Sequence, residues 1–84
     1  HKQTIIEVDT RDRLGLLYDI TNTLFRNQIT IRSAVIATYG EQAVDTFYVN
    51  DLFGEKINSS QKLEQLNKEL LFYLKKHFNK ALKV

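Results

Sequence analysis

The fold of this chain is limited most strongly by the order of the hydrophobic patterns along its sequence. Residues 4–9 form a β-branched run with partial alternation, and residues 14–27 repeat apolar side chains at spacings of three and four. Residues 29–39 and 43–50 are two more β-branched runs around Gly40 and Glu41, which predicts an antiparallel hairpin. A cluster of helix-capping residues at 58–60 precedes a second helical stripe. The predicted order is strand, helix, strand, strand, helix.

This order predicts an α+β fold of the ferredoxin-like type, βαββα(β), with two helices on one face of an antiparallel sheet. The predicted buried stripes are Leu17, Ile20, Leu24 and Phe25 in the first helix, and Leu63, Leu66, Leu70 and Leu74 in the second, with Phe78 as a candidate continuation. Residues 81–84 are too few for a good strand and resemble a helix end. We therefore expect the fourth strand to be missing or to come from sequence outside this chain.

Length and composition indicate one small domain spanning residues 1–84. A chain this short buries only about 60% of its unfolded surface, so it must pack efficiently or rely on a partner. The sequence has no cysteine, which excludes disulfides and thiolate metal sites. No apolar run approaches the roughly 20 residues of a membrane span, so we predict a cytoplasmic protein without membrane contacts. His1 stands in place of a start methionine, which indicates an excised fragment or a tag remnant, and no role is assigned to it.

The positive charge of the chain is concentrated at its C-terminal end. The net charge is +2 and the sequence pI is about 9.0. Lysines near a helix C-terminus complement the helix dipole, and this explanation is favoured over nucleic-acid binding. The lysines concerned are Lys75, Lys76, Lys80 and Lys83.

The second face of the predicted sheet is unusually apolar. If Tyr39 pairs with Gln42, then Ala34 lies opposite Phe47 and Ile36 opposite Asp45, on the helix-facing side with Ile6, Val8 and Val49. The opposite face should be polar if water covers it, but it is apolar and aromatic, which predicts an interface. The alternative is that another segment of the same chain covers it. The predicted interface residues are Ile31, Val35, Ala37, Tyr39, Val44 and Tyr48.

No catalytic or metal-binding constellation is evident. His1 and His77 are far apart, and the acids Glu7, Asp9, Asp12 and Asp45 form no recognisable acid–base pair. There is no glycine-rich phosphate loop either, so we predict no enzyme activity, no cofactor and no metal in this domain. RNA-recognition modules share the fold, but residues 43–49 carry an acid at their centre and no Arg or Lys, which argues against nucleic-acid binding.

The strongest local signal is the turn at residues 12–17, Asp-Arg-Leu-Gly-Leu-Leu, which follows a strand and opens a helix. Asp12 is the predicted N-cap. Gly15 in a first helical turn costs about 1 kcal/mol relative to alanine, a cost that close approach of a ligand would explain. Free N–H groups at the helix start suit a carboxylate, and Arg13 would add a charged donor. The alternative is that Gly15 only permits tight packing and that Asp12 only caps the helix.

The turn, in its strand–helix context, resembles that of the ACT domains. Residues 37–41 (Ala-Thr-Tyr-Gly-Glu), 44–49 (Val-Asp-Thr-Phe-Tyr-Val) and 51–57 are similar to the C-terminal ACT domains of bacterial bifunctional uridylyltransferase/uridylyl-removing enzymes. The resemblance implies a regulatory domain that senses an amino acid, glutamine in that group, and pairs with another ACT domain as a homodimer or in tandem. The parent enzyme is then expected to be a nucleotidyltransferase and phosphohydrolase that acts on the PII nitrogen-signalling protein, with Mg²⁺ as its metal.

The resemblance also implies a ligand site where the turn meets the sheet of a partner domain. The residues implicated are Asp12, Arg13, Leu14, Gly15 and Leu16, with Ser33 and Ala34 from the facing strand. Leu14 stands where the family usually has proline at the start of the helix, which predicts a less rigid turn. A segment before the first strand is expected to supply the missing edge strand. The alternative function is an ACT domain used only for assembly, without a ligand of its own.

Overall fold

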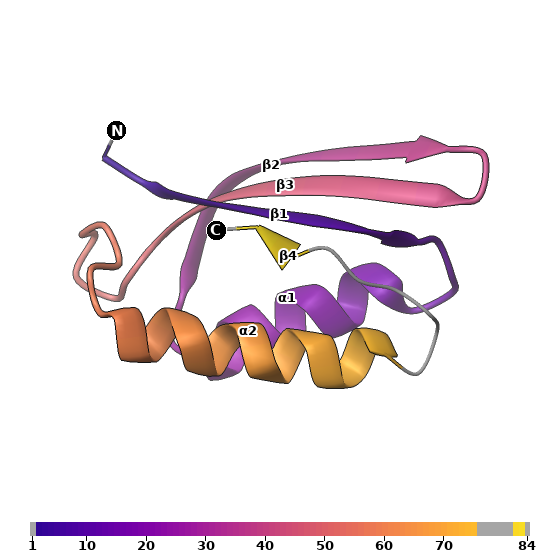
Figure 1. The fold of residues 1–84 in the computed structure, drawn as a ribbon. Helices are drawn as coiled ribbons and strands as arrows, with labels where there is room; N and C mark the ends of the chain where they lie inside the picture. Colours follow the sequence, from indigo (N-terminus) through magenta and orange to yellow (C-terminus); the bar gives the residue numbers. More distant parts are fainter. Residues whose placement is uncertain (1, 76–81, 84) are drawn as a thin grey trace.

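The computed structural model describes residues 2–75 and 82–83. Its elements are β1 (Thr4–Arg11), α1 (Leu16–Arg26), β2 (Thr30–Tyr39), β3 (Gln42–Asn50), α2 (Ser60–Lys75) and β4 (Leu82–Lys83). The strands form one antiparallel sheet in the order β2-β3-β1-β4, and both helices cover the same face of it (Figure 1). The predicted ferredoxin-like arrangement is confirmed. The predictions for His1, Lys76, His77, Phe78, Lys80, Ala81 and Val84 lie outside the described residues.

The register of the β2–β3 hairpin is the predicted one. Tyr39 pairs with Gln42 and Ala34 pairs with Phe47, across the turn at Gly40 and Glu41. Strands β1 and β3 alternate between buried and half-buried side chains, as expected for strands with one face on a core. The helix-facing side carries Ile6, Val8, Phe47 and Val49, all of them buried.

A β-bulge near the start of β2 changes the face on which Ile31 lies. Ile31 pairs with Val49 whereas Ser33 pairs with Tyr48, so Arg32 is an extra residue on β2. Because an inserted residue reverses the alternation of the strand, Ile31 faces the helices and packs against the core. Its prediction as an open-face residue is therefore wrong, whereas the strand alternates as expected after the bulge.

Helix α1 begins later than predicted, and its buried stripe differs from the predicted one. The helix begins at Leu16 instead of Leu14, and its buried residues are Leu16, Ile20, Thr23 and Leu24. Leu17 and Phe25, which were predicted to be buried, are 44% and 78% exposed. In α2 the predicted stripe is confirmed, with Leu66, Leu70 and Leu74 buried and Leu63 packed against the core.

The weak last strand is present as a two-residue strand, β4, at the edge of the sheet. Lys83 pairs with Glu7 and Leu82 pairs with Val8. The interpretation of these two residues as a helix end is therefore wrong, because edge pairing with β1 outweighs their weak strand propensity. Only two positions of β1 are covered in this way, so the rest of its outer edge is left without a strand from the described residues. The contribution of a preceding segment stays a prediction.

The N-terminus of α2 and the C-terminus of α1 follow ordinary capping chemistry, with one strained residue. Ser59 Oγ accepts a hydrogen bond of 3.2 Å from Lys62 N, so the predicted capping cluster does cap α2. After α1, Ile29 N donates to Leu24 O at 3.0 Å and Gln28 N donates to Phe25 O at 3.0 Å. Gln28 occupies the left-handed position of this C-terminal motif, with φ of 61°. Glycine is the residue that favours this position.

Replacing Gln28 by glycine is expected to stabilise the domain. The left-handed conformation costs a residue with a Cβ about 1 kcal/mol, which for a domain of this size corresponds to a rise of about 4–8 °C in Tm. Gln65→Gly, at an exposed position inside α2, is the matched control and should lower the stability by about 1 kcal/mol. Thermal unfolding of both variants measures this. Equal destabilisation by the two changes would contradict the strain at Gln28.

Candidate functional site

The turn between β1 and α1 is anchored to the tip of the β2–β3 hairpin. Asp12 N donates to Glu41 O at 2.7 Å, and the Arg11 guanidinium contacts the Glu41 carboxylate at 2.8 Å. Leu16 N donates to Arg13 O at 3.2 Å, which closes the turn. Leu14 is 100% exposed at its outer point. It lies two residues before the helix, so it is not in the first helical turn as predicted.

Gly15 is the N-cap of α1 and has a left-handed backbone, with φ of 81°. This conformation explains the glycine without any need for close ligand approach, since residues with a Cβ rarely adopt it. The N-cap contributes no side-chain hydrogen bond, so the prediction of Asp12 as N-cap is wrong. The first turn of α1 therefore keeps N–H groups that no capping side chain satisfies. Together with the positive end of the helix dipole, they form a site suited to an anion.

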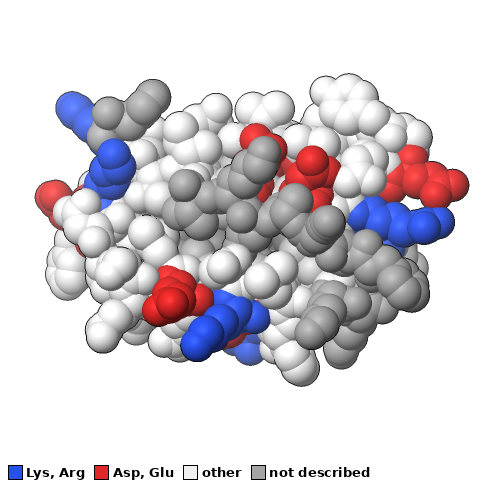
Figure 2. Space-filling model, viewed as in Figure 1, with Lys and Arg blue, Asp and Glu red and all other residues white. Residues whose placement is uncertain are grey.

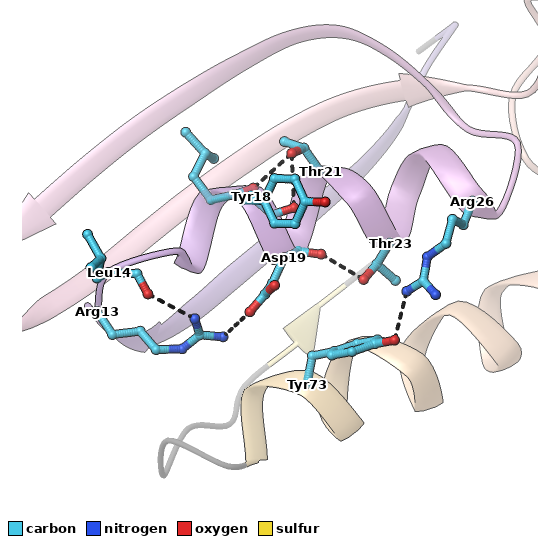
Figure 3. Close-up of polar contacts among 9 residues, drawn as sticks. Arg13, Leu14, Tyr18, Asp19, Thr21, Thr23, Arg26 and Tyr73 are labelled. Carbon is cyan, nitrogen blue, oxygen red and sulfur yellow. Dashed lines mark hydrogen bonds and ion pairs between the residues drawn. The ribbon is translucent and has the colours of Figure 1, made fainter.

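Arg13 is bound to the helix that it precedes (Figure 3). Its Nη2 lies 2.6 Å from Asp19 Oδ2, and its Nη1 donates to Leu14 O at 3.2 Å. The Arg13 side chain is only 14% exposed, and its Nε is buried without a partner. Arg13 therefore holds the turn against α1, and its two terminal nitrogens are already engaged.

Asp45 is a buried carboxylate of β3, level with Val8 of β1, and the sequence pattern did not place it at the site. The residue is 3% exposed on the helix-facing side of β3, where Oδ1 accepts a 3.3 Å hydrogen bond from Ala37 N. Burial raises the pKa of Asp45, the bond from Ala37 opposes this effect, and the negative charge of Asp12 raises the pKa further. Thr10 is a diagonal neighbour on β1, and its buried hydroxyl has no partner. The sequence feature that could have pointed to Asp45 is the presence of an acid in the otherwise apolar alternation of residues 43–49.

The structure brings only part of the predicted ligand site together within one domain. Asp12, Arg13, Leu14, Gly15 and Leu16 are contiguous at the turn. Ser33 and Ala34 are exposed on β2, level with Tyr48 and Phe47 of β3. The turn begins after Arg11, and Arg11 pairs with Gln42 of β3. Tyr48 lies six residues further along β3 than Gln42. This separation is roughly 20 Å along an extended strand. A site that uses both groups needs two domains.

Strand β2 exposes apolar side chains on both faces. Val35, on the open face, is 57% exposed, and Ile36, on the helix-facing side, is 50% exposed. The open face also carries Tyr39, Val44, Tyr48 and Ala37, as predicted from the register. Long apolar edge strands of this kind pair readily with other strands. That these residues form an interface stays a prediction.

The charged side chains of the described residues are mixed in sign in the view of Figure 2. Acidic and basic side chains are interspersed there, without a continuous basic patch among the described residues. Glu7 and Asp9 of β1 lie on the open face of the sheet, the face with which RNA-recognition modules stack bases. These carboxylates repel phosphate.

Within residues 2–75 and 82–83, no group of three or more His, Cys, Asp or Glu is placed to hold a metal ion. In the same residues no helix has the length and apolarity to cross a membrane.

Comparison with known proteins identifies the family. Residues 1–77 match the model described as the ACR family N-terminal ACT domain. The chain is an ACT domain. It is 64% identical over 67 residues to a bifunctional uridylyltransferase/uridylyl-removing enzyme of Cereibacter sphaeroides, a match that covers 80% of this chain and 7% of the relative. The same enzyme of Azospirillum brasilense is 52% identical over 71 residues, 84% of this chain and 8% of the relative. The ACT domain thus spans less than a tenth of the length of these curated relatives.

Solved structures of other regulatory domains share the fold. The ACT domain of GTP pyrophosphokinase from Chlorobium tepidum superposes with a TM-score of 0.69 at 14% identity and covers 96% of both chains. The regulatory subunit of aspartate kinase from Thermus thermophilus gives a TM-score of 0.67 at 12% identity, over 99% of this chain and 51% of that one. At these identities the likeness establishes the fold alone.

We expect Asp45→Asn to stabilise the ACT domain at pH 7. The pKa of Asp45 is raised in the folded state, so the folded protein binds more protons than the unfolded chain. Its stability therefore falls as the pH rises from the ordinary carboxyl value of 3.8 through the raised pKa. An amide removes this loss, so the gain in Tm should be present at pH 7 and should vanish below pH 3.8. Thermal unfolding across the pH range measures it.

Asp9→Asn is the control, because Asp9 lies on the opposite face of the sheet and bonds Gln42 at the surface. Asp9→Asn should give no comparable gain in Tm. A gain from Asp45→Asn that is the same at all pH values would show that the buried charge is not its origin.

Proposed function

We propose that this ACT domain is the glutamine-responsive regulatory domain of a bifunctional uridylyltransferase/uridylyl-removing enzyme. Its similarity to those enzymes, at up to 64% identity, supports the assignment to such a parent. In this proposal the parent is a cytoplasmic enzyme that uses Mg²⁺ at sites outside this domain and acts on the PII protein. The domain itself performs no chemistry and shifts the parent between its two activities.

Amino-acid sensing is supported by the combination of two features, the uncapped N-terminus of α1 and the buried acid Asp45. A free amino acid presents a carboxylate and an ammonium group on one carbon. The first turn of α1 offers N–H donors to the carboxylate, because Gly15 supplies no cap. Asp45 and Asp12 supply negative charge for the ammonium group, and Asp45 has only one weak hydrogen bond in the free domain. A buried carboxylate with so few partners costs stability, a cost that is typical of functional sites.

The regulatory mechanism that we propose is based on the distance between the turn and Ser33. A ligand held at the turn of one domain completes its contacts only when β2 of a second ACT domain approaches. Glutamine therefore binds the paired arrangement more tightly than the separate domains, and pairing and binding favour each other to the same extent. The parent enzyme responds to that change in pairing.

Glutamine is expected to raise the Tm of the chain, and the rise should grow with protein concentration because binding and pairing are linked. At 100 times its dissociation constant a ligand that binds only the folded form adds about 2.7 kcal/mol to the free energy of unfolding. Thermal unfolding against a panel of amino acids, with the oligomeric state measured alongside, tests this. Glutamate is the matched control ligand. Asp45→Asn should abolish the response while the variant itself remains folded and more stable.

A second candidate function is assembly without a ligand, and the apolar exposure of β2 favours it. In this case no amino acid in the panel shifts the Tm, and the chain still self-associates. The two functions are thus separated by the same experiment.

Under either function, Val35→Lys is expected to weaken self-association about tenfold or more. A lysine on an edge strand opposes strand addition and places a charge in an apolar contact. Sedimentation equilibrium measures the dissociation constant. Gln61→Lys, on the exposed side of α2, adds the same charge away from the sheet and should leave association unchanged. Equal effects of the two changes would rule out pairing through β2.

A further inference from the structure

A polar groove lies where the C-terminal end of α1 meets the N-terminal end of α2. Its volume is about 400 Å³, which is within the range of pockets that hold small molecules. The described residues that line it include two basic side chains and no acidic one. The β1–α1 turn lies at the other end of α1, about 16 Å away along the helix. Among the lining residues are Arg26, Asn27, Gln28, Gln61, Lys62 and Gln65.

The two basic side chains of the polar groove have no acidic partner. Neither Arg26 nor Lys62 forms an ion pair with any of the described residues. Arg26 is held in place by α2, because its Nη2 donates to the Tyr73 hydroxyl at 3.0 Å and its guanidinium lies over the Tyr73 ring, 5.2 Å from its centre (Figure 3). Lys62 is half-buried. Two cations in one groove attract an anion, and the prior placement of Arg26 lowers the entropy lost on binding.

Glu69 of α2 lies beside the groove, and its carboxylate is engaged by neutral amides. Its Oε1 accepts a hydrogen bond of 3.1 Å from Asn27 Nδ2, and its Oε2 accepts one of 3.4 Å from Gln65 Nε2. Asn27 Nδ2 also donates to Thr23 O at 2.8 Å. Glu69 therefore fixes two of the lining amides, and both basic side chains remain open to an anion from outside the chain.

Gln28 brings a further amide to the groove from a backbone position that favours glycine. Its φ of 61° costs a residue with a Cβ about 1 kcal/mol. Within residues 2–75 and 82–83, the side-chain amides of Gln28 and Gln61 have no hydrogen-bond partner. A strained residue whose side chain makes no bond of its own is typical of a functional position. The strain at Gln28 thus coincides with the place where two cations meet.

We propose that the polar groove binds the phosphate group of a small phosphate monoester. Arg26 and Lys62 balance its charge, which is about −1.5 to −2 at pH 7. Gln28 and Gln61 donate N–H groups to its three oxygens. A carboxylate, with one charge and two oxygens, matches this set of donors less well. The remaining volume holds the organic part of the ligand, and the site is separate from the one proposed to bind an amino acid.

Phenyl phosphate is the probe for this site, and phenyl sulfate is the control ligand because it has the same shape and only one charge. Titration of the 84-residue chain at constant ionic strength, followed by the NMR shifts of backbone amides, measures both dissociation constants. At about pH 8 we expect a dissociation constant of about 1 mM for phenyl phosphate and at least about tenfold weaker binding of phenyl sulfate. Below about pH 6 the phosphate loses its second charge, and its affinity should fall towards that of the sulfate.

Two variants test the residues assigned to the site. Lys62→Gln should weaken binding of phenyl phosphate about tenfold. Lys68→Gln removes the same charge from an exposed position of α2 outside the groove, and it should leave binding unchanged. Gln28→Gly should bind about fivefold more weakly although its Tm is expected to rise, so a loss of folding cannot explain the weaker binding.

Three results would overturn the proposal. These are shifts that do not saturate by about 50 mM phenyl phosphate, equal affinity for the two esters, and equal effects of Lys62→Gln and Lys68→Gln. The response to glutamine should be unchanged in the Lys62→Gln and Gln28→Gly variants, because the turn lies at the other end of α1. Failure of the phosphate site is therefore distinguishable from failure of amino-acid sensing.

Discussion

The pairing of β3 with both β1 and β2 is the constraint on which the other features of this ACT domain depend. All nine residues of β3 are paired, and its helix-facing side chains form the floor of the core. Because side chains alternate strictly along a strand, burying Phe47 and Val49 also places Asp45 on the helix-facing side of β3. The same alternation turns Val44 and Tyr48 to the open face. The core and the two proposed functional surfaces therefore follow from one register.

Two polar features of the domain have fewer hydrogen-bond partners than is usual. Asp45 is buried with a single weak hydrogen bond, and the N-terminus of α1 has no side-chain cap. Proteins usually satisfy buried acids and helix ends, so these two groups are the basis of the proposed amino-acid binding. The ion pair between Arg13 and Asp19 shows that the turn itself is well fixed. The groups that lack partners are therefore those that a ligand would satisfy.

The left-handed conformation of Gly15 sets where α1 begins. Gly15 is left-handed, so the helix begins at Leu16 and buries the stripe that contains Ile20 and Leu24. Tyr18 and Phe25 are then directed outward, and with the loop after β3 they form an apolar groove. The same helix thus carries an uncapped N-terminus and an apolar groove along its outer side.

The sequence by itself determined the fold class, the order of the elements, the hairpin register and the stripe of α2. These features depend on local periodicity and turn chemistry, which a single sequence displays. The sequence also located the turn at residues 12–16. Only the tertiary structure decided where α1 begins, that Ile31 faces the core, that Asp45 is buried on the helix-facing side and that Leu82 and Lys83 pair with β1. A left-handed glycine, an inserted residue in a strand and a contact between distant segments leave no periodic signal. They are set by packing between elements, which no local pattern records.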